Sequence, residues 1–530
     1  MKKLTIILFT ILFLNFQLIG QISLVKDINL GTNSSNPTLG QSVKIDGTLF
    51  FLADDGIGIF GYKLWKSDGT ESGTRLVKKI SSTSYDNISN LTSMNGILYF
   101  TANDDTNGIE LWRSDGTSSG TYMVKNINTT SYRGSQPSNL TVFKGFLYFT
   151  AQDGTSNSDL WKTDGTETGT IKFKQSLFYI TVNNLFATDD KLFFITGGSF
   201  YQRVLWVTDG TIIGTHSLRD LDINSTGLQL FNPTCFAQIN RKVYFFSAYR
   251  PDNSIYVSPH EGLFESDGTD SGTKIVRDFG EYQGVDSLTL NSNSTSLFLT
   301  VANQQLFFHV ISRTPGSSWA YEYHLWTSDG TNVGTKLVSP NTKNLLGFYS
   351  IANVNTNTYY LFNKEYDVGN AELWKFEGIT NIKLKDFSNY YRGSSQWVSF
   401  ESKLYLANTP IGIDSTSIFT LNGTTIEEYY KSTQSIRHIV EVDGNFYFDS
   451  FTPNYGSELW KTSFCYYVTS KQSGNWDDSN TWSCNMVPTI YNTVLINPNH
   501  VIDVDSGEKK VKKLILRGNI NVQSKISIQE

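Results

Sequence analysis

The stretch Leu111–Thr117 reads Leu-Trp-Arg-Ser-Asp-Gly-Thr, and close copies of it recur along the chain. Leu64–Thr70 and Leu160–Thr166 differ from it by one and two residues. The aromatic position of this motif returns at intervals of 41 to 62 residues, at Trp65, Trp112, Trp161, Trp206, Phe264, Trp326, Trp374, Phe419 and Trp460. Seven of the 11 Trp occupy this one position, so a structural repeat organises the chain.

Each repeat contains four short segments typical of β-strands. In one unit the first strand is Leu140–Phe143 and the second is Leu147–Phe149, rich in aromatic and branched residues. Tight-turn pairs such as Asn95-Gly96 precede several second strands. The Trp-bearing strand is third, and segments such as Leu76–Ile80 form the fourth. Four antiparallel strands per unit, with no sustained helical period, predict an all-β fold built as a β-propeller.

The two ends of the array indicate how it closes. Leu24–Ile28 has the sequence of a fourth strand, although no unit has yet begun. The last anchor, Trp460, is followed by Lys461–Ser463 without the turn or a fourth strand. We therefore expect the N-terminal strand to complete the last blade, which removes two exposed edges. Nine third strands predict about nine four-stranded blades, within a range of eight to ten; an open arc or two smaller propellers is the alternative.

These residues carry a resemblance to a known family. Glu110–Ile127 and Glu458–Lys461 resemble, in whole or in part, the Glu-Leu-Trp-x-x-Asp-Gly-Thr-x-x-Gly-Thr-x-Leu-Val-Lys-Asp-Ile repeat of secreted bacterial surface proteins, which are propeller-like. The resemblance covers residues 23 to about 464. It weakens in the seventh unit, at Phe376–Ile379, and in the eighth, at Leu421–Thr424. It implies export and surface display and no particular catalytic activity.

Composition and the N-terminus agree with export. The 530 residues are 39% hydrophobic, too apolar for a disordered chain, and the formal net charge of −6 argues against a nucleic-acid partner. Met1–Lys3 is basic and Leu4–Leu14 is apolar, which predicts a signal peptide over residues 1–21. The apolar run is shorter than the roughly 20 residues of a membrane span, so we expect no transmembrane segment in the mature chain. The expected location is extracellular or at the cell surface.

After residues 22–464, the predicted propeller, the pattern changes. Residues 465–530 begin with Gly474-Asn475-Trp476, Thr481-Trp482 and Val487-Pro488-Thr489, which resembles the start of β-solenoid-like segments in exported bacterial proteins. We expect a small β module, solenoid-like or sandwich-like, with both Trp in its core. Cys465 and Cys484 flank its start and are candidates for a disulfide in an oxidising setting.

Acidic residues recur at two places in each early unit. The Asp of the motif is short enough to accept backbone N–H groups of its own turn, so a structural role is favoured over a metal or acid role. The loops between strands two and three carry Asp54-Asp55-Gly56, Asp104-Asp105 and Asp153-Gly154. Clustered carboxylates suit calcium, but the EF-hand pattern is absent. We therefore expect no cofactor and keep calcium as the alternative.

Catalytic patterns are missing from the sequence. The 6 His are scattered, and neither a nucleophile elbow nor a phosphate-binding loop stands out, so no catalytic residue is assigned. Insertions at Pro251–His260 and Thr314–Glu322 lengthen two loops. The second contains Trp319, Tyr321 and Tyr323, candidates for stacking on sugar or peptide; packing over a blade edge is the alternative.

The expected function is an exported, non-enzymatic binding or display scaffold that contacts a protein or glycan at a cell surface through its propeller loops. Two alternatives stay open. One is a carbohydrate-active hydrolase or lyase with its site at the channel mouth. The other is a structural component of an extracellular matrix.

Overall fold

The structure is a computed structural model of the 530-residue chain. It describes residues 22–57, 61–81, 86–154, 158–174, 181–197, 204–218, 229–250, 260–281, 299–313, 321–338, 345–364, 371–377, 380–387, 396–400, 403–408, 415–432, 435–443, 445–463, 467–478, 481–482, 487–488, 493–505, 507–511, 513–522 and 526–528. The predicted signal peptide, residues 1–21, lies outside these ranges.

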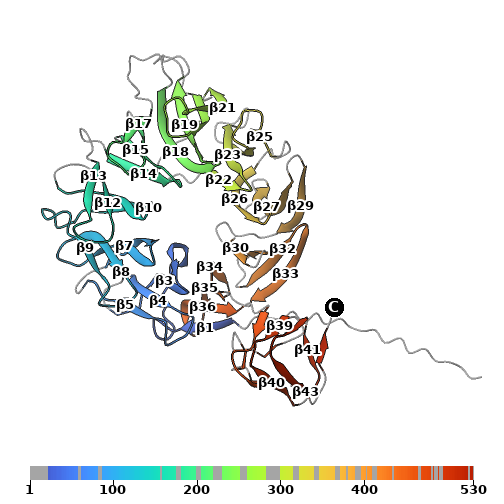
Figure 1. The fold of residues 1–530 in the computed structure, drawn as a ribbon. Coiled ribbons are helices and arrows are strands. Elements are labelled where there is room, and N and C mark those ends of the chain that lie inside the picture. Colours follow the sequence, from blue (N-terminus) through green and yellow to red (C-terminus); the bar gives the residue numbers. More distant parts are fainter. Residues whose placement is uncertain are drawn as a thin grey trace, which may run out of the picture.

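Nine four-stranded antiparallel sheets are arranged as blades around a ring, with the first strand of each blade nearest the centre (Figure 1). The fold is therefore the predicted all-β propeller, with nine blades in a single ring. The alternatives of an open arc and of two smaller propellers are wrong. In the described residues the one helical element is the short 3-10 turn η1 (Leu39–Gln41).

The first three blades follow the motif closely and have short outer strands. Blade one holds β2 (Val43–Ile45), β3 (Thr48–Ala53), β4 (Lys63–Ser67) and β5 (Arg75–Lys78). Blade two holds β6 (Ser89–Met94), β7 (Ile97–Asn103), β8 (Ile109–Ser114) and β9 (Tyr122–Lys125). Blade three holds β10 (Ser138–Phe143), β11 (Phe146–Ala151), β12 (Asp159–Thr163) and β13 (Ile171–Lys174).

The next three blades include the longest inner and second strands. Blade four holds β14 (Thr181–Ala187), β15 (Leu192–Gly197), β16 (Val204–Thr208) and β17 (His216–Leu218). Blade five holds β18 (Gln229–Ile239), β19 (Lys242–Arg250), β20 (His260–Ser266) and β21 (Lys274–Glu281). Blade six holds β22 (Leu299–Ala302), β23 (Gln305–Arg313), β24 (Tyr321–Ser328) and β25 (Lys336–Leu337).

Blades seven and eight are those in which the sequence departs from the Leu-Trp-x-x-Asp-Gly-Thr motif. Blade seven holds β26 (Leu345–Val354), β27 (Asn357–Lys364), β28 (Ala371–Glu377) and β29 (Thr380–Phe387). Blade eight holds β30 (Gln396–Phe400), β31 (Lys403–Asn408), β32 (Thr416–Asn422) and β33 (Thr425–Ser432). Here tight hairpins replace the Asp-Gly-Thr turn, with Glu377 opposite Thr380 and Asn422 opposite Thr425. The strands continue into these turns, so β29 and β33 have 8 residues where β5 has 4.

Blade nine is completed by the N-terminal strand, as the two ends of the array predict. It holds β34 (Ile436–Val442), β35 (Asn445–Thr452) and β36 (Gly456–Ser463), with β1 (Ile22–Lys26) as its outer strand. β1 is antiparallel to β36, and Leu24 lies opposite Trp460. The strand that begins the described chain and the strand that ends the propeller are therefore hydrogen-bonded neighbours.

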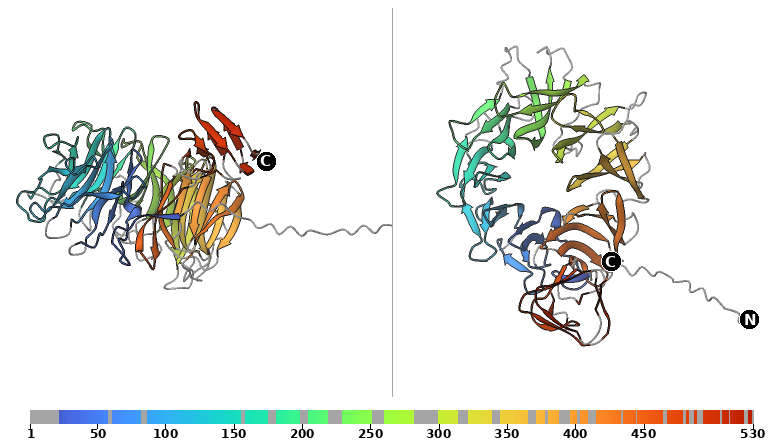
Figure 2. Two further views of the ribbon diagram at one scale, coloured as in Figure 1. Left: turned by 90° about the horizontal axis from the view of Figure 1, so that it is seen from below. Right: turned by 45° about the vertical axis from the view of Figure 1, so that its right-hand side comes forward.

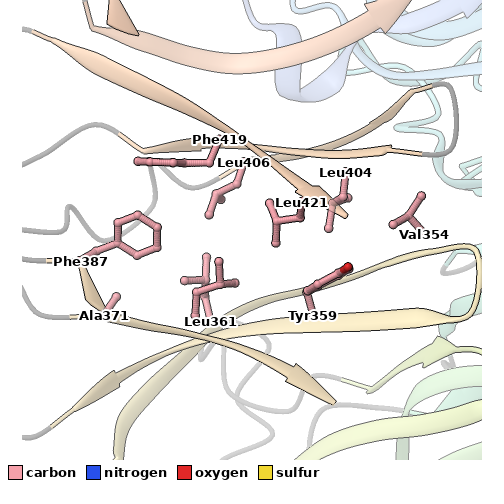
Figure 3. Packing of buried hydrophobic residues seen from close by; sticks show 10 residues of the cluster. Val354, Tyr359, Leu361, Ala371, Phe387, Leu404, Leu406, Phe419 and Leu421 are labelled. Atoms are coloured by element: carbon pink, nitrogen blue, oxygen red, sulfur yellow. The ribbon is translucent and has the colours of Figure 1, made fainter. Parts of the chain in front are cut away.

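Buried hydrophobic clusters join every pair of neighbouring blades, including blades nine and one. The anchor aromatic of each blade packs against the preceding blade: Trp112 lies with Phe50 and Leu52 of blade one, and Trp65 lies with Tyr447 of blade nine. Figure 3 shows the equivalent packing between blades seven and eight. The predicted burial of these aromatics between sheets is confirmed.

The C-terminal residues form a separate module of parallel strands beside blade nine (Figure 2). Its three parallel ladders are β37 (Tyr467–Thr469), β39 (Thr493–Ile496) and β42 (Lys513–Leu516); β38 (Gly474–Asn475), β40 (Val501–Val504) and β43 (Asn519–Val522); and β41 (Lys509–Val511) with β44 (Ile526–Ile528). Parallel stacking of successive turns is the pattern of a solenoid rather than a sandwich. Trp476 and Trp482 are fully buried in its core, as predicted.

In the part of the chain that the structure describes, no helix has the length and apolar character needed to cross a membrane.

The interblade packing predicts a large loss of stability when an anchor is truncated. Trp112 is 7% exposed, so Trp112→Ala should lower the free energy of unfolding by about 3–5 kcal/mol. Ile171, 47% exposed on the outer strand of blade three, is the control, and Ile171→Ala should cost less than about 1 kcal/mol. Urea unfolding of the two variants measures the difference. Equal losses would contradict the packing role of the anchors.

Candidate binding face

The topology gives the ring two faces with different kinds of loop. In a four-stranded antiparallel blade, the loop between strands two and three and the link to the next blade leave from the same end of the strands. We call this end of the ring the connection face. The opposite end, which carries the hairpin between strands one and two and the Asp-Gly-Thr turn, is the turn face. Backbone bonds support the assignment, because Asp54 N–H donates to Ser35 O at 2.9 Å and Gln152 N–H donates to Ser135 O at 2.8 Å.

On the turn face, the repeated Asp holds its own turn together. Asp115 Oδ1 accepts hydrogen bonds from the Thr117 hydroxyl at 2.7 Å and from the Thr117 N–H at 2.8 Å. These bonds hold the pKa of Asp115 below its ordinary value. The same pair of bonds forms at Asp68, Asp164, Asp209, Asp267 and Asp329. The structural role expected for the motif Asp is confirmed.

The two glycines of the motif are required by close contacts. A Cβ on Gly120 would lie 2.1 Å from Asp115 Oδ1, inside the same turn. Gly165 has φ +95°, and a Cβ there would lie 2.1 Å from the Tyr99 hydroxyl of the preceding blade. The Arg113 guanidinium of that blade also donates to Gly165 O at 3.3 Å. The turn therefore docks onto its neighbour, and the turn face has little freedom to vary.

On the connection face, the acidic loops are neutralised from within. Lys63 contacts the carboxylate of Asp55 and donates to Ile57 O at 2.8 Å. Asp104 accepts hydrogen bonds from the N–H and the side-chain amide of Asn107, each at 2.7 Å. The Ser81 hydroxyl lies 2.8 Å from both oxygens of Asp105. Each of these carboxylates therefore has a partner within the protein.

The third acidic loop has the same character. Lys172 Nζ lies 2.5 Å from Asp153 Oδ2 and 2.8 Å from Asp159 Oδ2, and the Asp159 side chain is fully buried. The two carboxylates that this blade brings together therefore share one ammonium group. Among the described residues, no group of three or more His, Cys, Asp or Glu side chains is arranged to hold a metal ion.

A buried glutamate clamps the link between blades, and sequence reasoning assigned it no role. Glu110 is fully buried and accepts hydrogen bonds from Asn128 N–H at 3.1 Å and Ser135 N–H at 2.9 Å, together with the Ser135 hydroxyl. Both partners lie on the link from blade two to blade three. Burial raises the pKa of Glu110 above its ordinary value.

The same clamp closes the ring. Glu458 accepts hydrogen bonds from Ile28 N–H at 3.1 Å, Asn29 N–H at 3.3 Å and Ser35 N–H at 3.0 Å, and the Ser35 hydroxyl donates to it at 2.6 Å. All these donors lie on the link from blade nine to blade one. Burial raises the pKa of Glu458 to about 7. The available signal was the Glu of the repeat together with a Ser-x-Pro in both links, at Ser35–Pro37 and Ser135–Pro137.

Above this hydrogen-bonded frame, large apolar side chains are exposed. Leu30 is 77% exposed, and Tyr132 is 82% exposed with the Arg133 guanidinium 5.6 Å from its ring centroid. Six exposed large apolar residues lie on the connection face, in or beside blades nine, one, two and three: Leu30, Ile57, Tyr62, Tyr132, Phe451 and Tyr455. We call these six residues the apolar rim. The turn face and the strand ends next to it carry as many comparable residues, spread over blades two, three, four and six: Tyr122, Val142, Ile171, Ile212, Ile213 and Val333.

The aromatic residues singled out from the sequence lie only partly within the described chain. Trp319 lies outside the described residues. Tyr321 and Tyr323 begin β24, with their backbones opposite Arg313 and Ile311 at the connection-face end of blade six. Their side chains lie outside the description, so their ligand-binding role stays a prediction.

The cysteine prediction also stays untested. Cys465 and Cys484, the candidate disulfide pair, lie outside the described residues. Cys235 lies on β18, and burial raises the pKa of its thiol.

Two histidines form pairs with single carboxylates. His260 Nδ1 lies 3.0 Å from Asp278 Oδ2, and His438 Nδ1 lies 2.8 Å from Asp449 Oδ1. The second hydrogen bond raises the pKa of His438. The two pairs belong to blades five and nine, so they do not converge on one centre.

The strand topology defines a nine-bladed β-propeller with a β-solenoid module. No family model matches the sequence, and no curated protein matches it. The structure is similar to a prolyl endopeptidase (TM-score 0.38, 10% identity, 70% of this chain and 54% of that chain) and to the tricorn protease (TM-score 0.32, 10% identity, 80% and 49%). It is also similar to an oligogalacturonate lyase in complex with manganese (TM-score 0.32, 10% identity, 60% and 85%). The match spans about half the length of the first two proteins, and the activities named are theirs.

The motif glycines predict a specific clash. A Cβ on Gly73 would lie 1.9 Å from Asp68 Oδ1, so Gly73→Ala should break the bonds from Asp68 to Thr70 and cost about 1–3 kcal/mol of stability. The neighbouring Ser72→Ala should stay within about 0.5 kcal/mol. In a double-mutant cycle with Asp68→Gly, the cost of Gly73→Ala should largely vanish. A full cost in the Asp68→Gly background would contradict the clash.

We call the junction between blades nine and one the seam. The Glu458 clamp at the seam should make the stability of the ring depend on pH. The folded pKa of Glu458, about 7, lies above its ordinary value of 4.5, so its stabilising contribution is complete below about pH 4.5 and is lost as the pH rises through 7. The melting temperature of the parent relative to Glu458→Gln should therefore fall between pH 5 and pH 8. Glu71→Gln, at an exposed turn, should show no such trend. A difference that stays constant or grows with pH would contradict this.

Proposed function

We propose that the chain is an exported, non-catalytic binding or display scaffold whose connection face contacts a protein or glycan partner. The observation that carries the proposal is the apolar rim: exposed large side chains supported by buried, hydrogen-bonded carboxylates. Exposed large apolar side chains lower solubility, and where several lie on one face they are typical of an interaction surface.

The links that carry Leu30 and Tyr132 of the apolar rim are held in place by hydrogen bonds within the protein, without a partner. The Glu458 clamp holds the segment that carries Leu30, and the Glu110 clamp holds the segment that carries Tyr132. Asn128 Oδ1 also accepts hydrogen bonds from the Thr130 hydroxyl at 2.9 Å and from Thr130 N–H at 3.2 Å. A preorganised loop loses less conformational entropy on binding than a free one, so rigid links favour affinity.

The side chains of the rim are of the kinds that contribute most to interfaces. Tyrosine and arginine are enriched among residues that dominate binding energy, because they combine apolar area with a polar end. Tyr132 and Arg133 form such a pair, since Arg133 Nε also donates to the Tyr132 hydroxyl at 3.1 Å. Tyr62 and Tyr455 add two further amphipathic rings. This composition suits a protein surface or the face of a sugar.

The acidic loops of blades one and three support binding over hydrolysis. A glycosidase needs two carboxyl groups that are free to exchange protons with substrate. Asp153 and Asp159 instead share Lys172, and Asp55 is engaged by Lys63. Export and surface display rest on the basic and apolar residues of the N-terminus and on the resemblance to secreted surface repeats.

The test is binding by the mature chain. We expect a glycan array, or a pull-down from cell surfaces, to yield a ligand whose binding falls at least tenfold in the double variant Tyr132→Ser, Phe451→Ser. The matched control is Ile213→Ser, Val333→Ser on the turn face, which should bind normally. Both variants should keep the parent melting temperature, because all four side chains are more than half exposed.

Equal effects of the two double variants would contradict a role for the connection face. Release of new sugar ends from polysaccharides would instead favour the hydrolase or lyase alternative. Self-association without any other ligand would favour the matrix alternative.

A further inference from the structure

The inner strands of blades two to eight carry no charged residue, and those of blades two to four also carry an Asn at an equivalent position. The inner strands β6, β10 and β14 read Ser-Asn-Leu-Thr-Ser-Met, Ser-Asn-Leu-Thr-Val-Phe and Thr-Val-Asn-Asn-Leu-Phe-Ala, without a charged residue. The inner strands on either side of the seam differ. β2 carries Lys44, and β34 carries Arg437, His438 and Glu441.

Each of the strands β6, β10 and β14 is interrupted by a bulge at an equivalent Asn. Asn90, Asn139 and Asn184 have φ values of +56°, +54° and +49°. The ladder register shifts at each, between Ser89 and Thr92 in β6 and at the matching positions of β10 and β14. A bulge takes residues out of the ladder and turns their polar groups away from the neighbouring strand.

Side-chain hydrogen bonds hold the bulges in place. The Ser138 and Thr150 hydroxyls lie 2.8 Å apart, and the Thr141 hydroxyl donates to Asn139 O at 3.0 Å. The Asn139 amide donates to Thr150 Oγ1 at 3.2 Å. Blade two repeats the arrangement, with the Ser89 and Thr101 hydroxyls 2.8 Å apart. The same bulge with positive φ recurs at Cys235 in blade five and at His438 in blade nine. The bulge is therefore common to several inner strands, and blades two to four differ in placing an Asn at it.

The polar groups on this edge remain accessible. Asn90, Ser93 and Asn184 are exposed, and Asn139 is half-buried. An inner strand is also an edge strand, so part of its backbone N–H and C=O groups face away from the sheet. The edge therefore offers uncharged donors and acceptors in three copies, on inner strands that touch one another from β6 to β10 and from β10 to β14.

We propose that the inner edges of blades two to four form a track that binds a neutral glycan chain. The absence of charge on the three strands disfavours anionic ligands, because no cation there would offset their desolvation. An extended peptide would have to add to a blade as a fifth strand, and the bulges oppose strand addition. Hydroxyl groups of a neutral sugar chain both donate and accept, which matches amide and hydroxyl side chains. This site is separate from the apolar rim and does not depend on it.

Three equivalent positions give the track its affinity. Each bulge Asn would bind a sugar weakly, with a Thr and a Ser beside it in blades two and three and Asn183 beside it in blade four. One chain that reaches several of these positions gains from the high effective concentration of the later contacts. We therefore expect affinity to rise with chain length, at least tenfold from a disaccharide to a hexasaccharide of the same linkage.

The experiment uses the mature chain and calorimetric titration with hexasaccharides. The neutral probes are cello-, xylo-, laminari- and maltohexaose, and the anionic probe is hexagalacturonate. We expect at least one neutral probe to bind and hexagalacturonate to bind at least tenfold more weakly. The triple variant Asn90→Gly, Asn139→Gly, Asn184→Gly keeps the positive φ but removes the amides, and should lose at least tenfold in affinity. Asn240→Gly, an exposed positive-φ residue in a hairpin turn, is the matched control and should bind normally.

A second variant covers the case in which the triple variant does not fold. Thr92→Val with Thr141→Val removes two hydroxyls at constant size and should lower the affinity three- to tenfold. The track is overturned if no neutral hexasaccharide binds, if hexagalacturonate binds as tightly, or if both folded variants bind like the parent.

Discussion

Ring closure is the constraint on which the rest of this structure depends. Each blade buries an anchor aromatic against the blade before it, so blade one has no partner for Trp65 until blade nine arrives. Bringing Leu24 to Trp460 closes a loop of more than 400 residues, at an entropic cost on the order of 5 kcal/mol. That cost is offset only when β1 pairs, the seam cluster forms and Glu458 engages the following link. The three contributions involve the same few residues, so closure is expected to be cooperative.

The clamp at the seam is not unique to it. Glu110 performs the same task between blades two and three, where chain connectivity already keeps the two blades together. At the seam the polar contacts join residues that are more than 400 positions apart, with Glu458 accepting four hydrogen bonds from one short segment. The junction between blades nine and one thus uses the same clamp as the junction between blades two and three. A partner that contacts the apolar rim meets the same rigid frame on both sides of the seam.

The sequence predicts local chemistry well because turn and strand preferences act over a few residues. Three such features were predicted correctly: the Asp68 turn, the strand Leu147–Phe149 and the additional strand Leu24–Ile28. The closure of the ring was predicted from the last of them. The Glu458 clamp was not predicted: the Ser-x-Pro of its link is visible in the sequence, but Ser35 and Glu458 are 423 residues apart and become neighbours only in the closed ring. The bulge at Asn139 was not predicted for a different reason. A positive φ and a shifted strand register do not change the pattern of hydrophobic residues from which the strands were predicted.

The two faces differ in how much change each can accept. On the turn face, a Cβ at Gly69 would lie 2.2 Å from the Tyr447 hydroxyl, and Gly330 faces Tyr244 in the same way, so a longer or bulkier turn would separate neighbouring blades. On the connection face, link residues such as Ile28, Leu39 and Ile127 pack into the interblade clusters, while Leu30 and Tyr132 of the same links point into solvent. The insertion between β19 and β20 and that between β23 and β24 both fall there. Both long insertions leave from the connection face, and that asymmetry favours the connection face over the turn face as the site of recognition.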